Sequence, residues 1–138
     1  MSPHTLTLRI FFEDTDAQGV VYHANYLRLA ERARSEWLRS CLEPENDVLW
    51  PEDGPLVVVR HLEIDYLASA KLEDIISIET RLTHLGSASF KLHQTFYRDK
   101  EILTDIKISL VCISRKGKVL RIPASWREKI EPHLQEGV

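Results

Sequence analysis

Two patterns of hydrophobic and polar side chains divide the chain. Over residues 5–12 polar and apolar side chains alternate, and β-branched and aromatic types are frequent, which predicts a strand. Over residues 23–40 apolar side chains recur at helical spacing, while arginine and glutamate fall mainly on the opposite side. This second pattern predicts an amphipathic helix whose buried face carries Tyr26, Leu29, Ala30, Ala33, Trp37 and Leu38.

The second half of the chain is dominated by alternation. Residues 41–55 are rich in proline, glycine and acidic side chains, and we interpret them as a connecting loop. Four extended segments follow, separated by short turns: LVVVRHLEIDYL, DIISIETRLTHL, ASFKLHQTFYRD and EILTDIKISLVCIS. Their connections are too short for parallel crossovers, so we expect largely antiparallel strands. RKGK predicts a hairpin turn, and PASWREKIEPHL predicts a short terminal helix.

One strand, one long helix and a run of antiparallel strands have one economical packing. The sheet has one apolar face, so we expect an α+β fold in which the helix lies across the concave face of a curved sheet. With 138 residues and 43% hydrophobic content, the chain has material for one core but too little length for two ordinary domains. Residues 1–138 are therefore predicted to form a single domain.

Composition removes several classes of function. The net charge is -3 and the basic residues are scattered, which argues against nucleic acid as a partner. No basic segment followed by an apolar run opens the sequence, and no apolar run approaches the roughly 20 residues of a spanning helix. We therefore expect a cytoplasmic protein without a membrane span. Cys41 and Cys112 are far apart and form no CxxC motif, so neither a disulfide scaffold nor a zinc site is indicated.

The stretch EDTDAQGVVYHANY, just before the predicted helix, carries the candidate chemistry. Gly19 can adopt positive φ at little cost, which permits a sharp turn between the aspartates and the helix. The first N–H groups of the helix, around His23 to Tyr26, have no intrahelical acceptor and carry the positive end of the helix dipole. Such N–H groups suit a carbonyl oxygen that becomes negative during acyl transfer.

Asp14 and Asp16 are the candidate bases or nucleophiles. In an extended segment their two-residue spacing points them to opposite sides, so one is expected to face the site and the other to support the loop. The alternative is purely structural: one aspartate caps the helix and the other forms an Asx-turn. His23 has a second pair of interpretations, as a general base or as a packing residue at the helix start.

Further candidates have weaker support. Glu31 lies roughly two helical turns beyond His23, although an ion pair with Arg34 or with an arginine on a neighbouring strand is the favoured interpretation. Tyr22 and Tyr26 are candidates for the wall of an acyl pocket or, for Tyr26, for the core. A metal site would need a fourth ligand that the sequence does not offer, so no metal or other cofactor is expected. No GxSxG motif supports serine catalysis, and Cys41 lies at the opposite end of the helix from the aspartates with no base beside it.

The stretch EDTDAQGVVYHANYLRLAERARSEWL closely resembles the hot dog fold thioesterases of the 4-hydroxybenzoyl-CoA type. Within them it resembles the YbgC-like branch of acyl-CoA thioesterases associated with the Tol-Pal system. The shared pattern is D-x-D-x-x-G-V-V-Y-H-A-N-Y, followed by E-R-A-R and an aromatic-Leu pair. IDYLASAKLED and the succession of strands extend the resemblance over essentially the whole chain.

The resemblance implies a hot dog fold, in which about five strands wrap the central helix, and hydrolysis of an acyl-CoA thioester bound between two subunits. It implies that Asp16 is the catalytic carboxylate and that the backbone N–H of His23 polarises the thioester carbonyl, with a role for the His23 side chain left open. Gly19, Tyr22, Tyr26 and Glu31 are the expected substrate-binding residues. Asp16 would either activate water or attack the carbonyl to give an acyl-enzyme anhydride.

The expected substrate carries a short, medium or aromatic acyl group, and the expected assembly is a homo-oligomer, either a dimer or a homotetramer built from two dimers. One departure concerns the CoA nucleotide: the hydroxybenzoyl-CoA branch has a basic cluster where this chain has Gly86, Ser87 and Ala88. Phosphate contacts would then fall to other basic side chains, namely Arg60, Lys91, Arg115, Lys116 and Lys118.

Three alternatives remain open at this point. In the first, the acyl donor would be an acyl carrier protein instead of CoA. In the second, the chain would be a non-catalytic acyl-binding or scaffolding protein that docks phospholipid-synthesis or cell-envelope proteins and has no need of Asp16. In the third, it would be a hot dog dehydratase, although the H-F-P segment of those enzymes is missing.

Overall fold

The computed structural model describes residues 3–42 and 54–135. Within these residues the elements follow in the order β1, α1, β2, β3, β4, β5, α2, with two short 3-10 turns. The strands are β1 (His4–Arg9), β2 (Leu56–Tyr66), β3 (Ile75–Leu85), β4 (Ser89–Arg98) and β5 (Glu101–Ile113). The helices are α1 (Asn25–Leu42) and α2 (Ala124–Ile130), and the 3-10 turns are Phe12–Asp14 and Glu131–His133.

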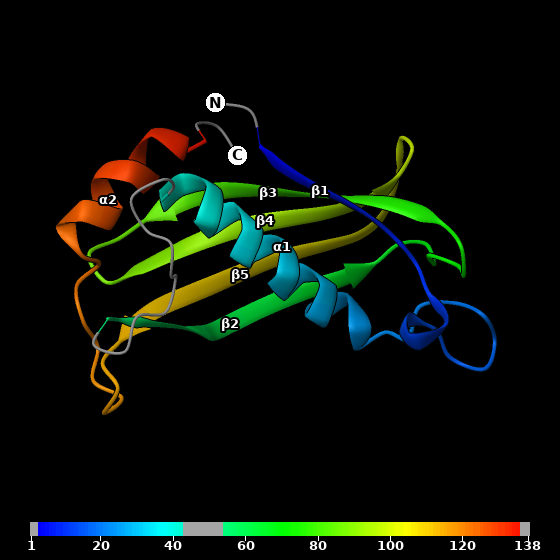
Figure 1. The fold of residues 1–138 in the computed structure, drawn as a ribbon, viewed down its shortest axis with the longest axis horizontal. Helices are drawn as coiled ribbons and strands as arrows, with labels where there is room; N and C mark the ends of the chain where they lie inside the picture. Colours follow the sequence, from blue (N-terminus) through cyan, green and yellow to red (C-terminus); the bar gives the residue numbers. More distant parts are fainter. Residues whose placement is uncertain (1–2, 43–53, 136–138) are drawn as a thin grey trace.

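The five strands pair into one antiparallel sheet in the order β1-β3-β4-β5-β2. Figure 1 shows α1 crossing one face of this sheet, which curves around the helix. The predicted α+β hot dog arrangement is therefore confirmed. The sequence did not indicate the place of β2, which pairs with β5 although β3 follows it in the chain. The outer edge of β2 has no strand partner among the described residues.

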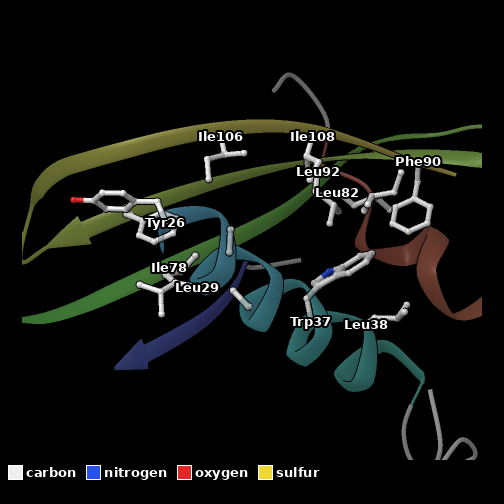
Figure 2. Packing of buried hydrophobic residues seen from close by; sticks show 14 of the residues in the cluster. Tyr26, Leu29, Trp37, Leu38, Ile78, Leu82, Phe90, Leu92, Ile106 and Ile108 are labelled. Atoms are coloured by element: carbon white, nitrogen blue, oxygen red, sulfur yellow. The ribbon is translucent and has the colours of Figure 1, made fainter. Parts of the chain in front are cut away.

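The core lies between α1 and the concave face of the sheet. Alternate residues of β3, β4 and β5 point toward the helix, as the period of a strand requires, and Figure 2 shows them meeting the buried face of α1. The ring centroids of Trp37 and Phe90 lie 5.9 Å apart at the centre of this contact. Replacing so deeply buried a side chain as Trp37 by alanine typically costs about 3–5 kcal/mol of stability.

Three predicted boundaries differ from the structure. The first strand ends at Arg9, not at residue 12, because the next residues turn into the 3-10 segment that begins at Phe12. The long helix begins at Asn25, not at residue 23, because a tight turn precedes it, in which the Asn25 N–H donates to the Tyr22 carbonyl at 2.8 Å. The terminal helix is shorter than PASWREKIEPHL, since Glu131–His133 continues it as a 3-10 turn.

Two predicted connections, the RKGK turn and the loop after the long helix, can be compared with the structure. RKGK forms the expected hairpin turn, closed by the Gly117 N–H on the Ser114 carbonyl at 2.9 Å, with Gly117 at positive φ. Of the predicted connecting loop over residues 41–55, Cys41 and Leu42 instead form the end of α1, and residues 43–53 lie outside the described residues. No helix among the described residues is both long enough and apolar enough to cross a membrane.

Candidate active site

The segment from residue 11 to residue 24 links β1 to α1, and Asp14 organises it. Asp14 is only 6% exposed. One carboxylate oxygen accepts the Phe11 N–H at 2.9 Å, and the other accepts the Arg28 guanidinium at 3.1 Å. The Asp14 carbonyl accepts the Tyr22 N–H at 3.1 Å and the Asn25 side-chain amide at 3.0 Å. Asp14 thus ties the end of β1, the loop and the first turn of α1 together, and it uses both carboxylate oxygens to do so.

Asp16, two residues further along the loop, is exposed. Its carboxylate accepts the Gln18 N–H at 2.8 Å, which is an Asx-turn, and its carbonyl accepts the Gly19 N–H at 3.1 Å. Gly19 has φ +80°, the positive value predicted for it. The second carboxylate oxygen of Asp16 has no protein partner among the described residues and is open to a ligand. The two aspartates therefore differ in their surroundings: Asp14 is buried and uses both carboxylate oxygens, whereas Asp16 is exposed.

The loop folds back on itself on either side of Gly19. Thr15 and Val21 form an antiparallel bridge, and the Asp16 N–H donates to the Val20 carbonyl at 2.9 Å. The far side of the loop is fixed to the segment before β3, where the Val21 N–H donates to the Ala70 carbonyl at 2.8 Å. The turn that carries the carboxylate is thus held by backbone hydrogen bonds on both sides.

The turn at the start of α1 presents two unpaired amides. Within residues 3–42 and 54–135 no acceptor lies in hydrogen-bond range of the N–H of His23 or of Ala24. Both residues are exposed, and both precede the first residue of α1. Unpaired N–H groups at the positive end of a helix dipole are suited to stabilising an oxyanion.

Aromatic rings surround this turn. The His23 ring lies 4.5 Å from the Tyr22 ring, centroid to centroid, and 6.3 Å from the Tyr66 ring, which it meets edge-on. Tyr22 is 46% exposed and remains a candidate wall of the site. Neither ring nitrogen of His23 hydrogen-bonds to any described residue, so none of these residues orients the imidazole as a base.

Tyr26 and Glu31, the other two predicted side chains, differ from Tyr22 in their surroundings. Tyr26 is only 2% exposed and its hydroxyl accepts the Ala70 N–H at 3.0 Å, so it belongs to the core that supports the site. Glu31 is exposed and lines a cavity of about 280 Å³ between α1 and the sheet. The predicted pair of Glu31 with Arg34 is electrostatic only, since their charged atoms are not within 4.0 Å of each other.

Arg34 reaches from the same cavity into a polar network in the core. Its guanidinium donates to the Gln94 side chain at 3.2 Å, and Gln94, fully buried, donates to the Ala30 carbonyl at 3.0 Å and to the Thr80 hydroxyl at 3.1 Å. Burial lowers the pKa of Arg34, and the nearby Glu31 carboxylate partly offsets that shift. The remaining lining of the cavity is mostly apolar and includes Trp37, Leu38, Val57, Phe90 and Leu110.

The basic residues proposed for the CoA phosphates are all exposed, and they are spread over β2, β4 and the turn after β5: Arg60, Lys91, Arg115, Lys116 and Lys118. The structure brings none of the five into the loop that carries Asp16. Cys41, the alternative nucleophile, is buried near the far end of α1, and burial raises the pKa of its thiol to about 12. That thiol therefore lacks the thiolate character of a nucleophile at neutral pH.

The family description of the thioesterase superfamily matches residues 18–104, more than half of the chain. This chain belongs to the thioesterase superfamily. The superfamily match begins two residues after Asp16, so the role of that carboxylate remains a prediction from the sequence and the geometry.

Individual relatives place the chain more closely within the superfamily. The acyl-CoA thioesterase YbgC of Haemophilus influenzae is 39% identical over 106 residues, which cover 77% of this chain and 77% of that protein. The acyl-CoA thioester hydrolase YbgC of Escherichia coli O6:H1 is 34% identical over 120 residues, which cover 86% and 88%. The crystal structure of a probable thioesterase from Bartonella henselae is 34% identical, with a TM-score of 0.78, and the match covers 89% of this chain and 100% of that chain. The resemblance to the YbgC-like thioesterases is confirmed.

Sequence reasoning missed the residues that hold the site in place. Arg28 reads as a solvent-facing helix residue, yet it binds the buried Asp14 carboxylate, and Tyr66 reads as the end of a strand, yet its hydroxyl reaches the His23 carbonyl. No local pattern encodes either contact, because their partners lie 14 and 43 residues away. Asn25 had a weak signal as a polar residue at a helix start.

Proposed function

We propose that this protein is an acyl-CoA thioesterase that hydrolyses a short-chain, medium-chain or aromatic acyl thioester to the free acid and CoA. The observation that carries the proposal is an exposed carboxylate, Asp16, on the same loop as the two unpaired amides at the start of α1. A carboxylate and oxyanion donors are the groups that thioester hydrolysis requires. The names of the YbgC relatives support the same activity.

In the proposed reaction the thioester carbonyl oxygen accepts the His23 N–H. Asp16 then removes a proton from a water molecule as that water adds to the carbonyl carbon, or the carboxylate attacks the carbon itself and water opens the resulting anhydride. In both routes the C–S bond breaks and the sulfur leaves as a thiolate. A thiolate is already a good leaving group, so the reaction needs no cofactor.

The assembly is proposed to be a homodimer joined along β2. This strand has a free outer edge, and Val58, Val59 and Tyr66 are exposed along it. Two copies that pair antiparallel through this edge form one continuous sheet with both long helices on the same face. In this arrangement the Tyr66 end of β2 in one copy lies beside the Val57 end of β2 in the other copy. Asp16 of one subunit is thereby brought toward the cavity of the partner subunit. Such dimers can pair further into a tetramer.

The cavity beside α1 is the proposed site of the acyl group. Its volume of about 280 Å³ is at the small end of ligand pockets, which typically span roughly 300–1,000 Å³, and its lining is mostly apolar. A short, medium or aromatic acyl group fits these dimensions better than a long chain. A CoA-linked substrate would place the reaction in the cytoplasm. An acyl carrier protein is the alternative donor, favoured by the absence of a basic cluster at Gly86, Ser87 and Ala88.

Thiol release from purified protein tests the proposal. The protein is incubated with acetyl-, butyryl-, octanoyl-, palmitoyl- and benzoyl-CoA, and free thiol is followed with a chromogenic disulfide, with heat-treated protein as the control. Octanoyl-loaded acyl carrier protein is assayed in parallel. Preferred hydrolysis of octanoyl-, butyryl- or benzoyl-CoA is expected. Absence of thiol release from every ester would leave a binding or scaffolding protein as the better account, and release from the carrier protein alone would change the donor.

The dimer is tested by mass. Light scattering coupled to size-exclusion chromatography is expected to give twice or four times the 16.0 kDa of the chain. A proline in place of Val58 or Val59 interrupts hydrogen bonding along a strand edge, so one of these two variants is expected to shift the mass toward the monomer and to lower thiol release. A wild-type monomer that hydrolyses acyl-CoA would remove the partner subunit from the site.

A further inference from the structure

The hydroxyl of Tyr66 connects the end of β2 to the turn that carries the unpaired amides. It donates to the His23 carbonyl with an oxygen–oxygen distance of 2.9 Å. Tyr66 is the last residue of β2 and pairs with Thr104 of the neighbouring strand, so its backbone is fixed in the sheet. The turn at His23 is exposed and lies outside any helix or strand. The hydroxyl therefore joins a fixed element to a less constrained one.

The His23 carbonyl needs this partner. In a continuous helix it would accept the N–H four residues on, but the Leu27 N–H donates to the Ala24 carbonyl instead, at 3.2 Å. Among the described residues, the Tyr66 hydroxyl is the group that donates to the His23 carbonyl. The preceding carbonyl, that of Tyr22, is fixed separately by the Asn25 N–H at 2.8 Å. Both peptide planes of the turn are thus held through their carbonyl oxygens.

Fixing a carbonyl also fixes the amide of the same peptide unit. A trans peptide is planar, and its N–H points opposite to its C=O. The hydrogen bond on the Tyr22 carbonyl consequently sets the direction of the His23 N–H, and the hydrogen bond on the His23 carbonyl sets the direction of the Ala24 N–H. We propose that Tyr66 is a positioning residue that aims the Ala24 N–H at the thioester oxygen as a second oxyanion donor beside the His23 N–H. This inference rests on the proposed thioesterase activity.

The ring of Tyr66 is itself braced by the core. It meets the Tyr26 ring edge-on with centroids 5.6 Å apart, and Tyr26 meets the Phe96 ring at 5.4 Å. The Tyr26 hydroxyl in turn accepts the Ala70 N–H at 3.0 Å, in the segment that also binds the loop of Asp16 through Val21. A chain of contacts thus runs from the sheet through Tyr26 and Tyr66 to the two amides.

Removal of one hydroxyl tests this role. The variant Tyr66→Phe keeps the ring contacts and loses only the hydrogen bond to His23. Because an oxyanion forms only in the transition state, kcat is expected to fall about tenfold while KM changes by less than about twofold. Tyr97→Phe is the matched control: Tyr97 is a half-buried tyrosine on β4 whose hydroxyl binds no described residue, and its removal is expected to leave kcat unchanged.

A second measurement needs no activity. In the ligand-free protein the carbonyl carbon resonance of His23 and the amide resonance of Ala24 are expected to shift in Tyr66→Phe and to stay in place in Tyr97→Phe. Unchanged resonances together with unchanged kcat would overturn the positioning role. A fall in kcat with an equally large rise in KM and a lower melting temperature would overturn it too, in favour of a general structural role. If the wild type hydrolyses no ester, the proposed function fails, and the resonances alone then decide whether Tyr66 orients the turn.

Discussion

The two ends of α1 contrast in what surrounds them. At the N-terminal end the residues before Asn25 are exposed, two amides have no acceptor among the described residues, and a carboxylate lies on the adjoining loop. At the C-terminal end Cys41 and Leu42 are buried, and α2 packs against this part of the helix (Figure 1). One end of the helix is thus exposed and is the proposed site of substrate binding, whereas the other end is packed into the core.

The chemistry available to a residue therefore depends on which end of α1 it lies near. Cys41 is intrinsically the better nucleophile, but its burial disfavours the thiolate. Asp16 is intrinsically a weak base, but it is exposed and close in sequence to unpaired amides. The same distinction separates Asp14 from Asp16, because the buried aspartate supports the loop while the exposed one is open to substrate.

The largest expected effect is on the rate of hydrolysis in Asp16→Asn. The change is nearly isosteric and removes the carboxylate proposed to act as base or nucleophile, so kcat is expected to fall by about 10²–10⁴-fold. Steady-state thiol release from the preferred acyl-CoA measures it. The melting temperature should be preserved, since Asn can still accept the Gln18 N–H. Wild-type turnover in this variant would contradict the proposed role of Asp16 at the N-terminal end of α1.

Labelling of Cys41 tests the opposite end of the helix. A pKa of about 12 instead of the usual value near 9 implies about a thousandfold less thiolate at neutral pH. Iodoacetamide at pH 8 is therefore expected to modify the Cys41 peptide far more slowly in the native protein than in urea, as followed by mass spectrometry. Because the unfolded chain loses this proton first, stability is expected to fall as the pH rises from about 9 to about 12. Rapid labelling in the native state would contradict the burial of this end.

Asp14→Asn should separate support from catalysis within the loop. The variant weakens the hydrogen bonds to Phe11 and Arg28, and hydrogen bonds to charged groups typically contribute about 1.5–3 kcal/mol. We expect a loss of about 2 kcal/mol in the free energy of unfolding, measured by guanidinium denaturation at one fixed protein concentration. In Asp16→Asn the loss should stay within about 0.5 kcal/mol. Equal losses in the two variants would mean that both aspartates are structural.

The smallest expected effect belongs to His23→Ala. The imidazole makes no hydrogen bond to the described residues, whereas the backbone N–H is retained in the variant. We expect kcat to change by less than about threefold, well below the 10²–10⁴-fold that general acid–base catalysis supplies. A hundredfold loss with an unchanged melting temperature would give the ring a role as general base and would shift the account from the amide to the side chain.

Much of this fold follows from the periodicity of the sequence. The alternation over β2 to β5 and the helical spacing around Trp37 predict an antiparallel sheet with one covering helix, since each pattern has one face to bury. Strand order could not be predicted in the same way. The pairing of β2 with β5 joins residues 38 to 57 positions apart, and local alternation carries no information about the partner.

The site was predictable in its chemistry but not in its support. The positive φ of Gly19 follows from local chemistry, because glycine has no side chain to oppose it. The contacts of Arg28 and Tyr66 could not be foreseen, because they join residues that only the tertiary structure brings together. The choice of Asp16 as catalytic residue came from resemblance and remains a proposal that the geometry supports.

Binding of a substrate analogue tests whether the carbonyl oxygen of the substrate lies at the amides of His23 and Ala24. Wild-type protein labelled with ¹⁵N is titrated with a ketone analogue of the preferred acyl-CoA, in which a methylene group replaces the sulfur. The account predicts that the amide resonances of His23 and Ala24 shift in proportion to occupancy, while those of Cys41 and Leu42 stay in place. Saturable binding that leaves His23 and Ala24 unmoved, or that moves only the C-terminal end of α1, would contradict it.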